Sequence, residues 1–453
     1  MKKILMIGFI NFIFLSLVAF FTYNYVVSKK NRVKILEKEV IKLQSEIDSL
    51  PTSQESLALS DFVSQKFTVK KINYILKKKK VSDLTTSKHP GSIGNSYIQN
   101  SEGKLFMASA NGIFSFIELE KFYLENAKLN IIQSNLRDII KNPKFYARSA
   151  YGIKDLLIHK NRFYISYTNE LKKDCYNTSI LVSDISTKKL SFKKFFEPKE
   201  CIKSSNEEYS PHQSGGRMVP YSGNNILFSV GEYRFRDHAQ NQKNIFGKIL
   251  SLNLSDGKTN IISMGHRNPQ GLFFDNKKNI ILSTEHGPAG GDEININFSP
   301  GKKVENFGWP ISSYGEHYKE GGIAYHTGYE SNERENKKYK IWPLYKSHKD
   351  HGFLEPLKYF TPSIAISEII SVNRNFNNIS EQQIFVAAMG NKIEEGDLSL
   401  HWFILDENFA IKSHEVIKLN ERIRDLFYDE NLNKIFLFLE SSASIGVFQV
   451  SEN

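Results

Sequence analysis

The feature that most restricts the folding of this chain is a long succession of short, β-prone runs separated by polar turns. The runs begin near residue 89 and continue to the C-terminus, and many follow a turn such as Ser222-Gly223-Asn224. Representative runs are 104–108, 162–167, 225–230, 383–387 and 434–439. Many short strands at regular spacing are typical of all-β sandwiches, barrels and propellers. At four strands per blade, roughly 365 residues of such material would build a propeller of about six blades.

The composition agrees with a large core and gives no support for nucleic-acid binding. The 453 residues include 33 Phe and 21 Tyr, and 40% of all residues are hydrophobic. The formal net charge of +11 comes from lysines scattered among Asn, Ile and Glu, whereas nucleic-acid binders often gather their positive charge on one face or arm. The one dense patch, at 77–80, is interpreted as a solvated loop, with contact to anionic lipid as the less favoured alternative.

Residues 1–28 have the character of an uncleaved membrane anchor. Two lysines follow Met1, and the run from Ile4 to about Val27 is mostly Ile, Leu, Phe and Val. This run is long enough to cross a hydrocarbon core of roughly 30 Å. It continues through aromatic residues where a cleaved signal peptide would have a small-x-small site. Basic residues on both sides leave the orientation open by the positive-inside rule.

A heptad pattern over residues 29–51 predicts a coiled-coil stalk. Its apolar positions alternate in steps of three and four, and they are Val33, Leu36, Val40, Leu43, Ile47 and Leu50. β-branched residues at one seam position and leucine at the other favour a parallel homodimer. A single amphipathic helix is the alternative, and Pro51 ends the helix in either case. Residues 52–88 show no sustained period and are predicted to be a linker.

The chain has two cysteines, Cys175 and Cys201. They could be free buried thiols, or a disulfide if the domain is exported. Charged residues flank each of them, for example Lys173-Asp174 before Cys175. This pattern argues against deep burial and favours the disulfide.

Two polar clusters flank a strand-like run between Gly265 and Pro310. The first reads GHRNPQGL, the second reads EHGPAGGDEIN and is followed by NFGWP, and the run 280–284 separates them. Clusters at strand ends are where a rigid scaffold presents ligand-binding groups. Together, at this spacing, the blocks resemble the glucose/sorbosone dehydrogenase family, which includes the soluble quinoprotein glucose dehydrogenases and the aldose dehydrogenases. The resemblance runs from about residue 154 to the C-terminus, and it implies a six-bladed β-propeller over 89–453.

A further stretch, PHQSGGRM at 211–218, also matches the family and is followed by Glu232 at the end of the next strand. By this resemblance, His212 is the general base that deprotonates the sugar hydroxyl, and Glu232 orients its imidazole. A histidine suits this role because it titrates near neutral pH, and a carboxylate behind the ring stabilises the imidazolium. The loop is one residue longer than in the glucose dehydrogenases, and Pro211 stands where they carry Asp. Taken alone, His212 would be interpreted as a turn residue beside a Gly-Gly bend.

Two pairs of residues are expected to hold the cofactor that the resemblance implies, pyrroloquinoline quinone (PQQ). Arg422 and Arg424 alternate along a predicted strand, so both side chains face one side. Aligned guanidinium groups suit a polycarboxylate such as this tricarboxylate. An ordinary charged strand, with Asp425 neutralising one arginine, is the alternative. Arg267 and Asn268 match residues that contact the quinone carbonyl, where a cation stabilises the charge that arrives with a hydride.

The resemblance also implies a calcium ion. Gly287 and Pro288 match backbone carbonyls that ligate Ca²⁺ in the family, and oxygen ligands of this kind suit calcium, which would polarise the quinone as a Lewis acid. Asp292 and Glu293 follow in the same loop. They are expected to brace the loop.

Two departures from the family pattern bear on cofactor affinity. The family often carries a lysine after a strand like 384–389, where it pairs with a cofactor carboxylate, and here that position is Gly390. Lys392 is near but lies beyond a short turn. The upstream GLLG-type substrate segment is degenerate and reads GIKDLL at 152–157.

These features predict a PQQ-dependent enzyme that oxidises an aldose sugar or related polyol and passes electrons to a respiratory acceptor. We expect a single-pass anchor in the inner membrane, with the propeller in the periplasm. The alternative is a catalytically inactive propeller that serves as a membrane-anchored glycan- or protein-binding module, because a fold does not by itself decide function.

Overall fold

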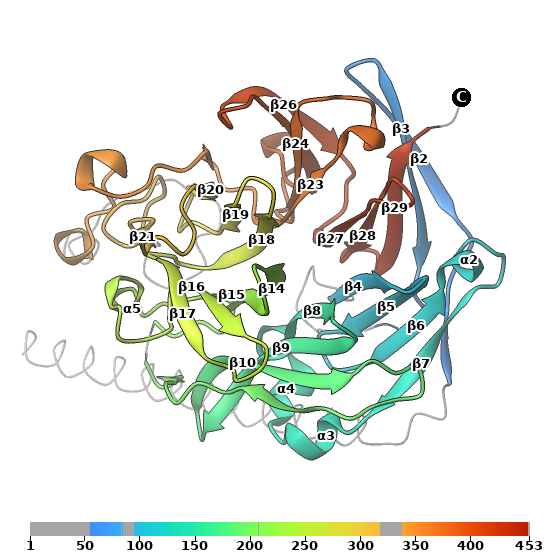
Figure 1. The fold of residues 1–453 in the computed structure, drawn as a ribbon, viewed down its shortest axis with the longest axis horizontal. Helices are drawn as coiled ribbons and strands as arrows, with labels where there is room; N and C mark the ends of the chain where they lie inside the picture. Colours follow the sequence, from blue (N-terminus) through green and yellow to red (C-terminus); the bar gives the residue numbers. More distant parts are fainter. Residues whose placement is uncertain (1–54, 83, 85–94, 207, 318–337, 452–453) are drawn as a thin grey trace, which may run out of the picture. The chain divides into compact units, whose positions relative to one another are not determined.

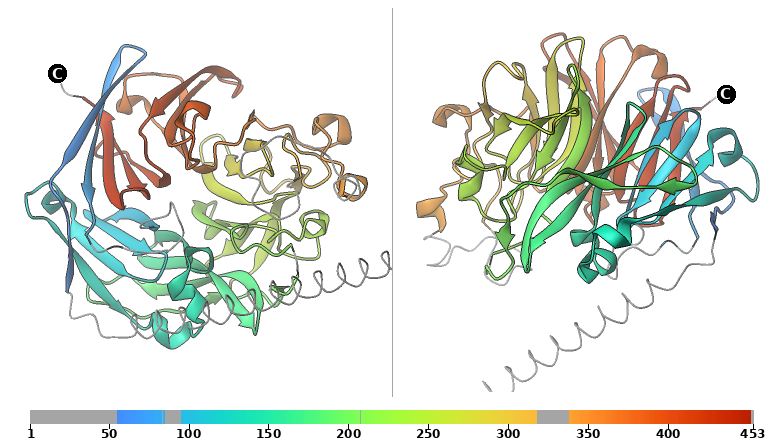
Figure 2. Two further views of the ribbon diagram at one scale, coloured as in Figure 1. Left: turned by 180° about the vertical axis from the view of Figure 1, so that it is seen from behind. Right: turned by 60° about the horizontal axis from the view of Figure 1, so that its bottom comes forward.

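Six sheets, antiparallel except where β11 (Lys189–Leu190) pairs with β7 (Lys128–Ser134) and β21 (Glu305–Asn306) with β17 (Thr259–Met264), surround a common axis in the computed structural model (Figure 1). The structure describes residues 55–82, 84, 95–206, 208–317 and 338–451. Seen from two further directions, the sheets stand side by side like blades around the axis (Figure 2). The predicted all-β, six-bladed propeller is therefore confirmed.

Each blade has an inner strand next to the axis. The inner strands are β4 (Ser96–Ser101), β8 (Ile153–His159), β14 (Gly215–Tyr221), β18 (Pro269–Asp275), β23 (Ile366–Val372) and β27 (Ile423–Asp429). The second strands are β5 (Lys104–Ser109), β9 (Arg162–Lys172), β15 (Asn225–Val230), β19 (Ile280–Glu285), β24 (Gln382–Ala388) and β28 (Lys434–Leu439). The third strands are β6 (Phe114–Glu118), β10 (Cys175–Asp184), β16 (Lys248–Asn253), β20 (Asp292–Asn297), β25 (Ser399–Leu405) and β29 (Ser444–Val450).

Outer strands and short helices complete the blades. The outer strands are β1 (Ser56–Ala58), β2 (Val63–Val69), β3 (Ile72–Lys80), β7 (Lys128–Ser134), β11 (Lys189–Leu190), β12 (Lys193–Phe196), β13 (Ile202–Lys203), β17 (Thr259–Met264), β21 (Glu305–Asn306), β22 (Lys358–Phe360) and β26 (Ile411–Lys418). The α-helices are α2 (Leu119–Phe122), α3 (Leu136–Ile139), α4 (Pro143–Ala147) and α5 (Asp237–Gln240). The 3-10 helices are η1 (Ser149–Tyr151), η2 (Lys349–His351), η3 (Arg374–Phe376) and η4 (Ile393–Glu395).

The ring is closed by strands from opposite ends of the described chain. β3 pairs antiparallel with β29, the last strand, and in Figure 1 the blue β3 lies beside the red β29. The prediction that 52–88 is a linker is therefore wrong, because β1, β2 and β3 lie within it. The lysines at 77–80 also do not form a loop: Lys79 is 1% exposed, and its Nζ donates to the Leu124 carbonyl at 2.6 Å.

The core lies between the blades and is rich in aromatic residues. In one cluster, Tyr74 of β3 stacks on Phe448 of β29 with ring centroids 5.0 Å apart. Trp402 stacks on Phe385 at 5.8 Å and meets Tyr74 edge-on at 5.9 Å. Such side chains bury a large apolar area each, so the closing strand β3 contributes to the core as well as to the sheet.

A disulfide joins Cys175 at the start of β10 to Cys201, with the two Cα atoms 5.4 Å apart. The expectation of a disulfide is therefore confirmed. Cys175 is nevertheless buried, at 6% exposure, although the charged neighbours had argued against burial. Lys173 and Asp174 are exposed at the turn before β10, whereas Cys175 already pairs with Lys203 of β13.

Replacing both cysteines by serine should lower the free energy of unfolding by about 3 kcal/mol, because the disulfide closes a loop of 26 residues and restricts the unfolded chain. Urea unfolding of the oxidised wild type and the double variant measures the difference. Wild-type protein unfolded in the presence of a reductant is the control and should match the variant. Equal stability of the two proteins, or labelling of both thiols in denatured but unreduced wild type, would contradict the disulfide.

The predicted membrane anchor (1–28) and coiled-coil stalk (29–51) lie outside the described residues. Within the part of the chain that the structure describes, no helix is long and apolar enough to span a bilayer.

Candidate active site

Irregularities in the inner strands bring polar side chains to the axis. Five of the six inner strands (β8, β14, β18, β23 and β27) carry a register shift against their second strand near the point where they begin. In β8 the extra residue is Lys154, and in β27 it is Arg424. A bulge of this kind re-aims a side chain and bends the strand. The alternation of side chains between the two faces is therefore interrupted near the start of these inner strands, where they line the central channel of the propeller.

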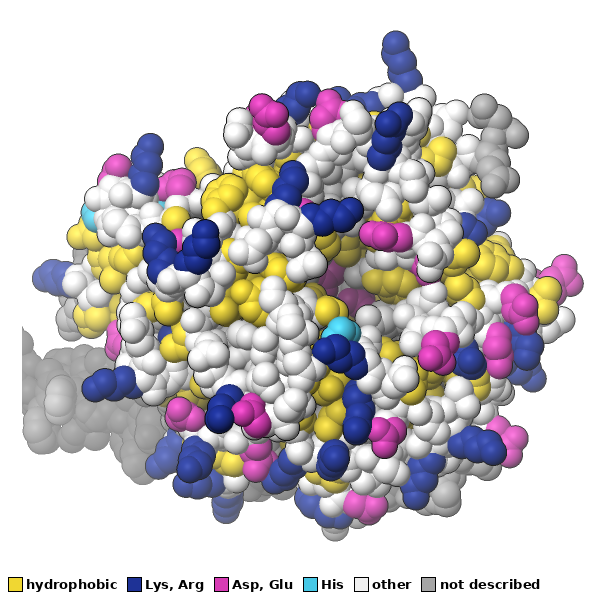
Figure 3. Space-filling model, viewed as in Figure 1, with side chains coloured by type: hydrophobic (Ala, Val, Ile, Leu, Met, Phe, Trp, Pro, Cys, Tyr) yellow, Lys and Arg dark blue, Asp and Glu magenta, His cyan; other side chains and the backbone are white. Residues whose placement is uncertain are grey.

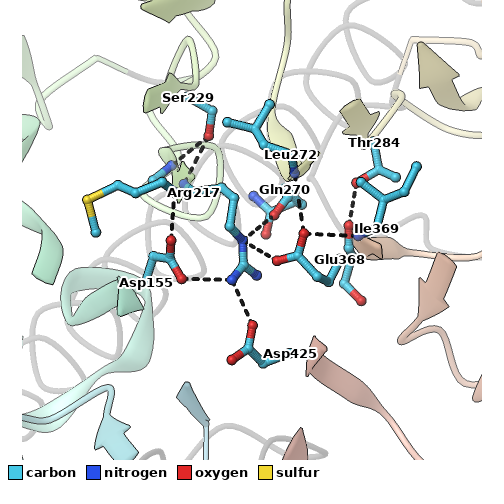
Figure 4. Close-up of polar contacts among 12 residues, drawn as sticks. Asp155, Arg217, Ser229, Gln270, Leu272, Thr284, Glu368, Ile369 and Asp425 are labelled. Atoms are coloured by element: carbon cyan, nitrogen blue, oxygen red, sulfur yellow. Dashed lines mark hydrogen bonds and ion pairs between the residues drawn. The ribbon is translucent and has the colours of Figure 1, made fainter. Parts of the chain in front are cut away.

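A buried group at the axis, which we call the arginine hub, consists of Arg217, Asp155, Glu368 and Asp425 (Figure 4). One guanidinium nitrogen, NH1, lies 2.7 Å from Asp155 and 2.7 Å from Asp425, and Arg217 Nε lies 2.5 Å from Glu368. All four side chains are at most 8% exposed. Each comes from a different inner strand, so the hub ties blades together at the centre.

Main-chain groups extend the arginine hub to the two remaining inner strands. Asp425 accepts a hydrogen bond from the Ile98 amide of β4 at 2.8 Å, and Glu368 accepts one from the Leu272 amide of β18 at 3.3 Å. Burial raises the pKa of all three carboxyl groups, repulsion from neighbouring carboxylates adds to the rise for Asp155 and Glu368, and Arg217 opposes the shift. The ionisation of these three buried carboxyl groups therefore depends on one cation, Arg217.

The arginine hub separates two parts of the channel. On one side, a cavity of about 660 Å³ is lined by the later residues of all six inner strands. The face drawn in Figure 3 is hollowed at its centre, and acidic side chains are visible deep in the hollow. The residues that the sequence singled out lie on the other side, where the inner strands begin.

The loop before β14 places Gln213 against Glu232. With its amide turned to suit its neighbours, Gln213 donates to Glu232 Oε1 at 2.6 Å and accepts from Arg267 NH2 at 2.8 Å. Gln213 and Glu232 are buried, whereas His212 lies in the preceding turn and is exposed. Burial raises the pKa of Glu232 to about 7, although the charge of Arg267 opposes this. This contact between Gln213 and Glu232 is one that sequence reasoning missed.

Two glycines shape the start of β14 behind this loop. Gly215 and Gly216 both have positive φ, at 61° and 122°, a region that glycine adopts readily. A Cβ on Gly216 would lie 2.3 Å from the Cβ of Lys154. The loop therefore packs closely on β8, and the register shift in β14 falls within it.

The GHRNP segment supplies Arg267 and Asn268 to the same place. Arg267 NH1 donates to the His286 carbonyl at 2.8 Å, and the guanidinium lies 5.6 Å from the Trp309 ring centroid. Asn268 Oδ1 accepts from the Gly215 amide at 3.1 Å. Both residues are at most 5% exposed, so the segment is held firmly between two blades.

A buried carboxylate, Glu285 at the end of β19, fixes the main chain of this segment. It accepts hydrogen bonds from the amide nitrogens of Arg267 and Asn268. It also lies 2.9 Å from His266, whose other ring nitrogen is 2.7 Å from Ser263 Oγ. Ser263, His266 and Glu285 are linked as serine, histidine and carboxylate are in a catalytic triad. All three side chains are buried, so their role here is to position Arg267.

Arg422 and Arg424 converge on one carboxylate that sequence reasoning had missed. Glu440, which is fully buried, lies 3.4 Å from Arg422 Nε and 2.7 Å from Arg424 Nε. Arg422 also donates to the Met389 carbonyl. The two guanidinium groups reach the same carboxylate, but not by alternation along a strand, because Arg422 precedes β27 and Arg424 is the extra residue in its bulge. The alternative in which Asp425 neutralises one of them is wrong, because Asp425 binds Arg217.

His286 marks the point where the cationic side chains meet. Burial lowers its pKa to about 3, with further lowering by Arg267, Arg424 and Arg422. The residues expected to bind the quinone are therefore brought together around one position, although they come from blades distant in the sequence.

The loop expected to bind calcium is braced as predicted. Asp292 accepts from the Gly287 amide at 3.0 Å and from the Ile366 amide at 3.0 Å, and Glu293 lies 3.2 Å from His348. Among the described residues, no cluster of three or more His, Cys, Asp and Glu could hold a metal ion. A calcium ion at this loop would therefore rest on main-chain carbonyl oxygens, which are ligands that calcium accepts.

Position 390 has no room for a side chain unless Asp397 moves. A Cβ on Gly390 would lie 2.0 Å from the carboxyl group of Asp397. Lys392 forms an exposed ion pair with Glu395 at 2.9 Å. The lysine expected after β24 is therefore absent, and an aspartate takes up the space beside the glycine.

Comparisons with known proteins agree with this geometry. The family model described as Glucose / Sorbosone dehydrogenase matches residues 123–445. Aldose sugar dehydrogenase YliI of Escherichia coli is 27% identical over 272 residues, which cover 55% of this chain and 65% of that protein. Quinoprotein glucose dehydrogenase B of Acinetobacter calcoaceticus is 32% identical over 146 residues, or 25% of this chain and 28% of that protein. Across the curated relatives it matches, the chain covers between 28 and 65% of their lengths.

Solved structures show the same fold. The apo form of soluble aldose sugar dehydrogenase from Escherichia coli aligns with a TM-score of 0.57 at 17% identity, covering 86% of this chain and 100% of that one. The PQQ-bound form of aldose sugar dehydrogenase from Streptomyces coelicolor aligns with a TM-score of 0.53 at 15% identity, covering 86% and 99%.

Proposed function

The chain belongs to the glucose/sorbosone dehydrogenase family, and from that premise we propose that it is a quinoprotein that oxidises an aldose sugar or a related polyol with PQQ as cofactor. The observation that carries the proposal is the convergence of Arg267, Arg422 and Arg424 around His286 at one end of the channel. Names of relatives point the same way, since they include an aldose sugar dehydrogenase and a quinoprotein glucose dehydrogenase.

The charges of the site fit an anionic cofactor. Glu440 opposes Arg422 and Arg424 together, and Glu232 has a raised pKa beside Arg267. The cations therefore exceed the ionised acids near them, and a tricarboxylate would restore the balance through charge-assisted hydrogen bonds. Bound there, PQQ would supply the acceptor for the hydride. Arg267 and Asn268 would hold its carbonyl end, and Arg422 and Arg424 would hold its carboxylates.

We assign the substrate proton to His212. Oxidation of an alcohol by hydride loss releases a hydroxyl proton to a base, and histidine is suited to accept it near neutral pH. His212 is exposed in the turn that precedes buried Gln213. Glu232 acts on this loop through Gln213, so we give it a positioning role. Calcium, held by the carbonyls of Gly287 and Pro288, would contribute Lewis acidity at the quinone.

The proposed setting is the outer face of the inner membrane, with a respiratory acceptor for the electrons. The disulfide supports an oxidising compartment, because such bonds persist in the periplasm and are rare in the cytosol. Anchoring through 1–28 and parallel pairing through 29–51 are parts of the same proposal that rest on the sequence alone.

Titration of the purified protein with PQQ and Ca²⁺, followed by quinone absorbance, tests the function. The wild type should bind, and Arg424→Met should bind about 10–100-fold more weakly, because hydrogen bonds to charged groups contribute about 1.5–3 kcal/mol. Arg374→Met removes an exposed arginine outside the site and should change nothing. A folded wild type that binds no quinone would contradict the proposal and favour the non-enzymatic binding module.

A further inference from the structure

Lys154 is a cation of the channel that no part of the proposed function has yet used. It is the extra residue in the bulge of β8, between Ile153, which pairs with Tyr167, and Asp155, which pairs with Ser166. Its Cβ faces Gly216 in the loop that carries Gln213. The bulge thus sends Asp155 into the arginine hub and leaves Lys154 on the side of the channel that holds the candidate active site.

The ammonium group of Lys154 is held by main-chain oxygens. Its Nζ donates to the carbonyls of Ser149 at 3.1 Å and Ala150 at 2.8 Å. These two bonds use two of the three protons of an ammonium group. The third is left for a ligand, and the two carbonyls hold the nitrogen in a defined place.

The charged neighbour of Lys154 is another cation. Burial and the positive charge of Arg424 lower the pKa of Lys154 to about 7. In the described part of the chain no carboxylate forms an ion pair with Lys154, since the adjacent Asp155 is committed to Arg217 and to the Met218 amide. A half-buried cation beside a second cation is unfavourable unless an anion completes the site.

We propose that Lys154 is a fourth cationic ligand of the anion bound in this site and pairs with a carboxylate of the quinone cofactor. The inference rests on the proposed function and adds a residue to it. Position 390 is closed by Asp397, and Lys392 is tied to Glu395 on the surface. Lys154 of β8 thus supplies the ammonium group that is missing after β24, at Gly390. Arg424 links the two regions, because it borders Lys154 and shares Glu440 with Arg422.

Three variants test this role by binding rather than by turnover. Lys154→Met removes the charge, Lys154→Gln removes the charge but keeps a donor for the carbonyls, and Lys392→Met is the matched control. The probe is PQQ with Ca²⁺, followed by quinone absorbance. We expect both Lys154 variants to bind about 10–100-fold more weakly than the wild type, and Lys392→Met to bind as the wild type does.

Thermal unfolding of the cofactor-free proteins separates a ligand role from a structural one. Lys154→Met loses two hydrogen bonds to main-chain carbonyls and should unfold at a somewhat lower temperature, which Lys154→Gln should partly restore. A ligand role predicts in addition that the rise in unfolding temperature on adding PQQ is smaller in both variants than in the wild type. Equal PQQ affinity of wild type and both Lys154 variants overturns the inference and leaves the proposed function intact. Absence of PQQ binding by the wild type overturns the proposed function itself.

Discussion

Replacing Arg217 by methionine should lower the free energy of unfolding by about 3–5 kcal/mol, the cost of leaving buried charges without their partner. Asp155, Glu368 and Asp425 would lose their common cation, while their main-chain bonds hold them in place. The loss should be felt by the whole propeller, because the arginine hub joins every inner strand. Urea unfolding at pH 7.5 measures it.

Arg162→Met is the matched control for this prediction. Arg162 pairs with Asp184 at 2.8 Å, but these side chains are 41% and 81% exposed. Exposed pairs contribute about 0–1 kcal/mol, so the control should be nearly neutral. Adding Glu368→Gln to Arg217→Met should restore part of the stability, because it removes one of the unpaired charges. If Arg217→Met costs no more than Arg162→Met, the arginine hub does not hold the blades together.

The fold was predictable where its signals are local and not where they depend on distant pairing. β-prone residues and a preceding turn mark the individual strands, so the sequence predicts an all-β fold of many short strands, and the count of six blades comes from the family resemblance. The closing strand β3 does not, since its partner β29 lies at the far end of the chain. Tyr74 and Leu76 alternate as in a strand, but four lysines follow them and do not look like strand residues in the sequence. In the structure, Lys79 is buried and Lys78 pairs with Glu421 at 2.6 Å.

The basic residues of the candidate site could mostly be predicted from the sequence, whereas the acidic residues beside them mostly could not. Arg267, Arg422 and Arg424 stand in recognisable motifs, and the structure brings them together. Glu440, by contrast, has no motif around it, and it reaches the arginines because β27 and β28 are neighbours. Lys154 falls in a segment that looks degenerate. Its orientation depends on a register shift, which a sequence does not display.

His212→Ala should reduce turnover by roughly 10²–10⁴, the usual effect of losing a general base, with PQQ affinity barely changed. His159→Ala is the control, because His159 ends β8 at the opposite end of the strand from Lys154. Steady-state oxidation of aldoses by the loaded enzyme, with an artificial electron acceptor, measures the effect. Turnover within a few-fold of the wild type would exclude His212 as the base.

The variant Glu232→Gln shows which group accepts the proton if His212→Ala keeps its turnover. Glu232 is buried, carries a pKa raised to about 7, and accepts a hydrogen bond from Gln213. If His212 is the base, Glu232→Gln should act through the loop, and Gln213→Ala should reproduce much of its effect. If His212→Ala is active while Glu232→Gln loses 10²-fold or more, the carboxylate itself accepts the proton, as a group with a pKa near the working pH can. The rate would then rise with pH through about 7 in the wild type, as Glu232 loses its proton, and that rise would be absent in Glu232→Gln.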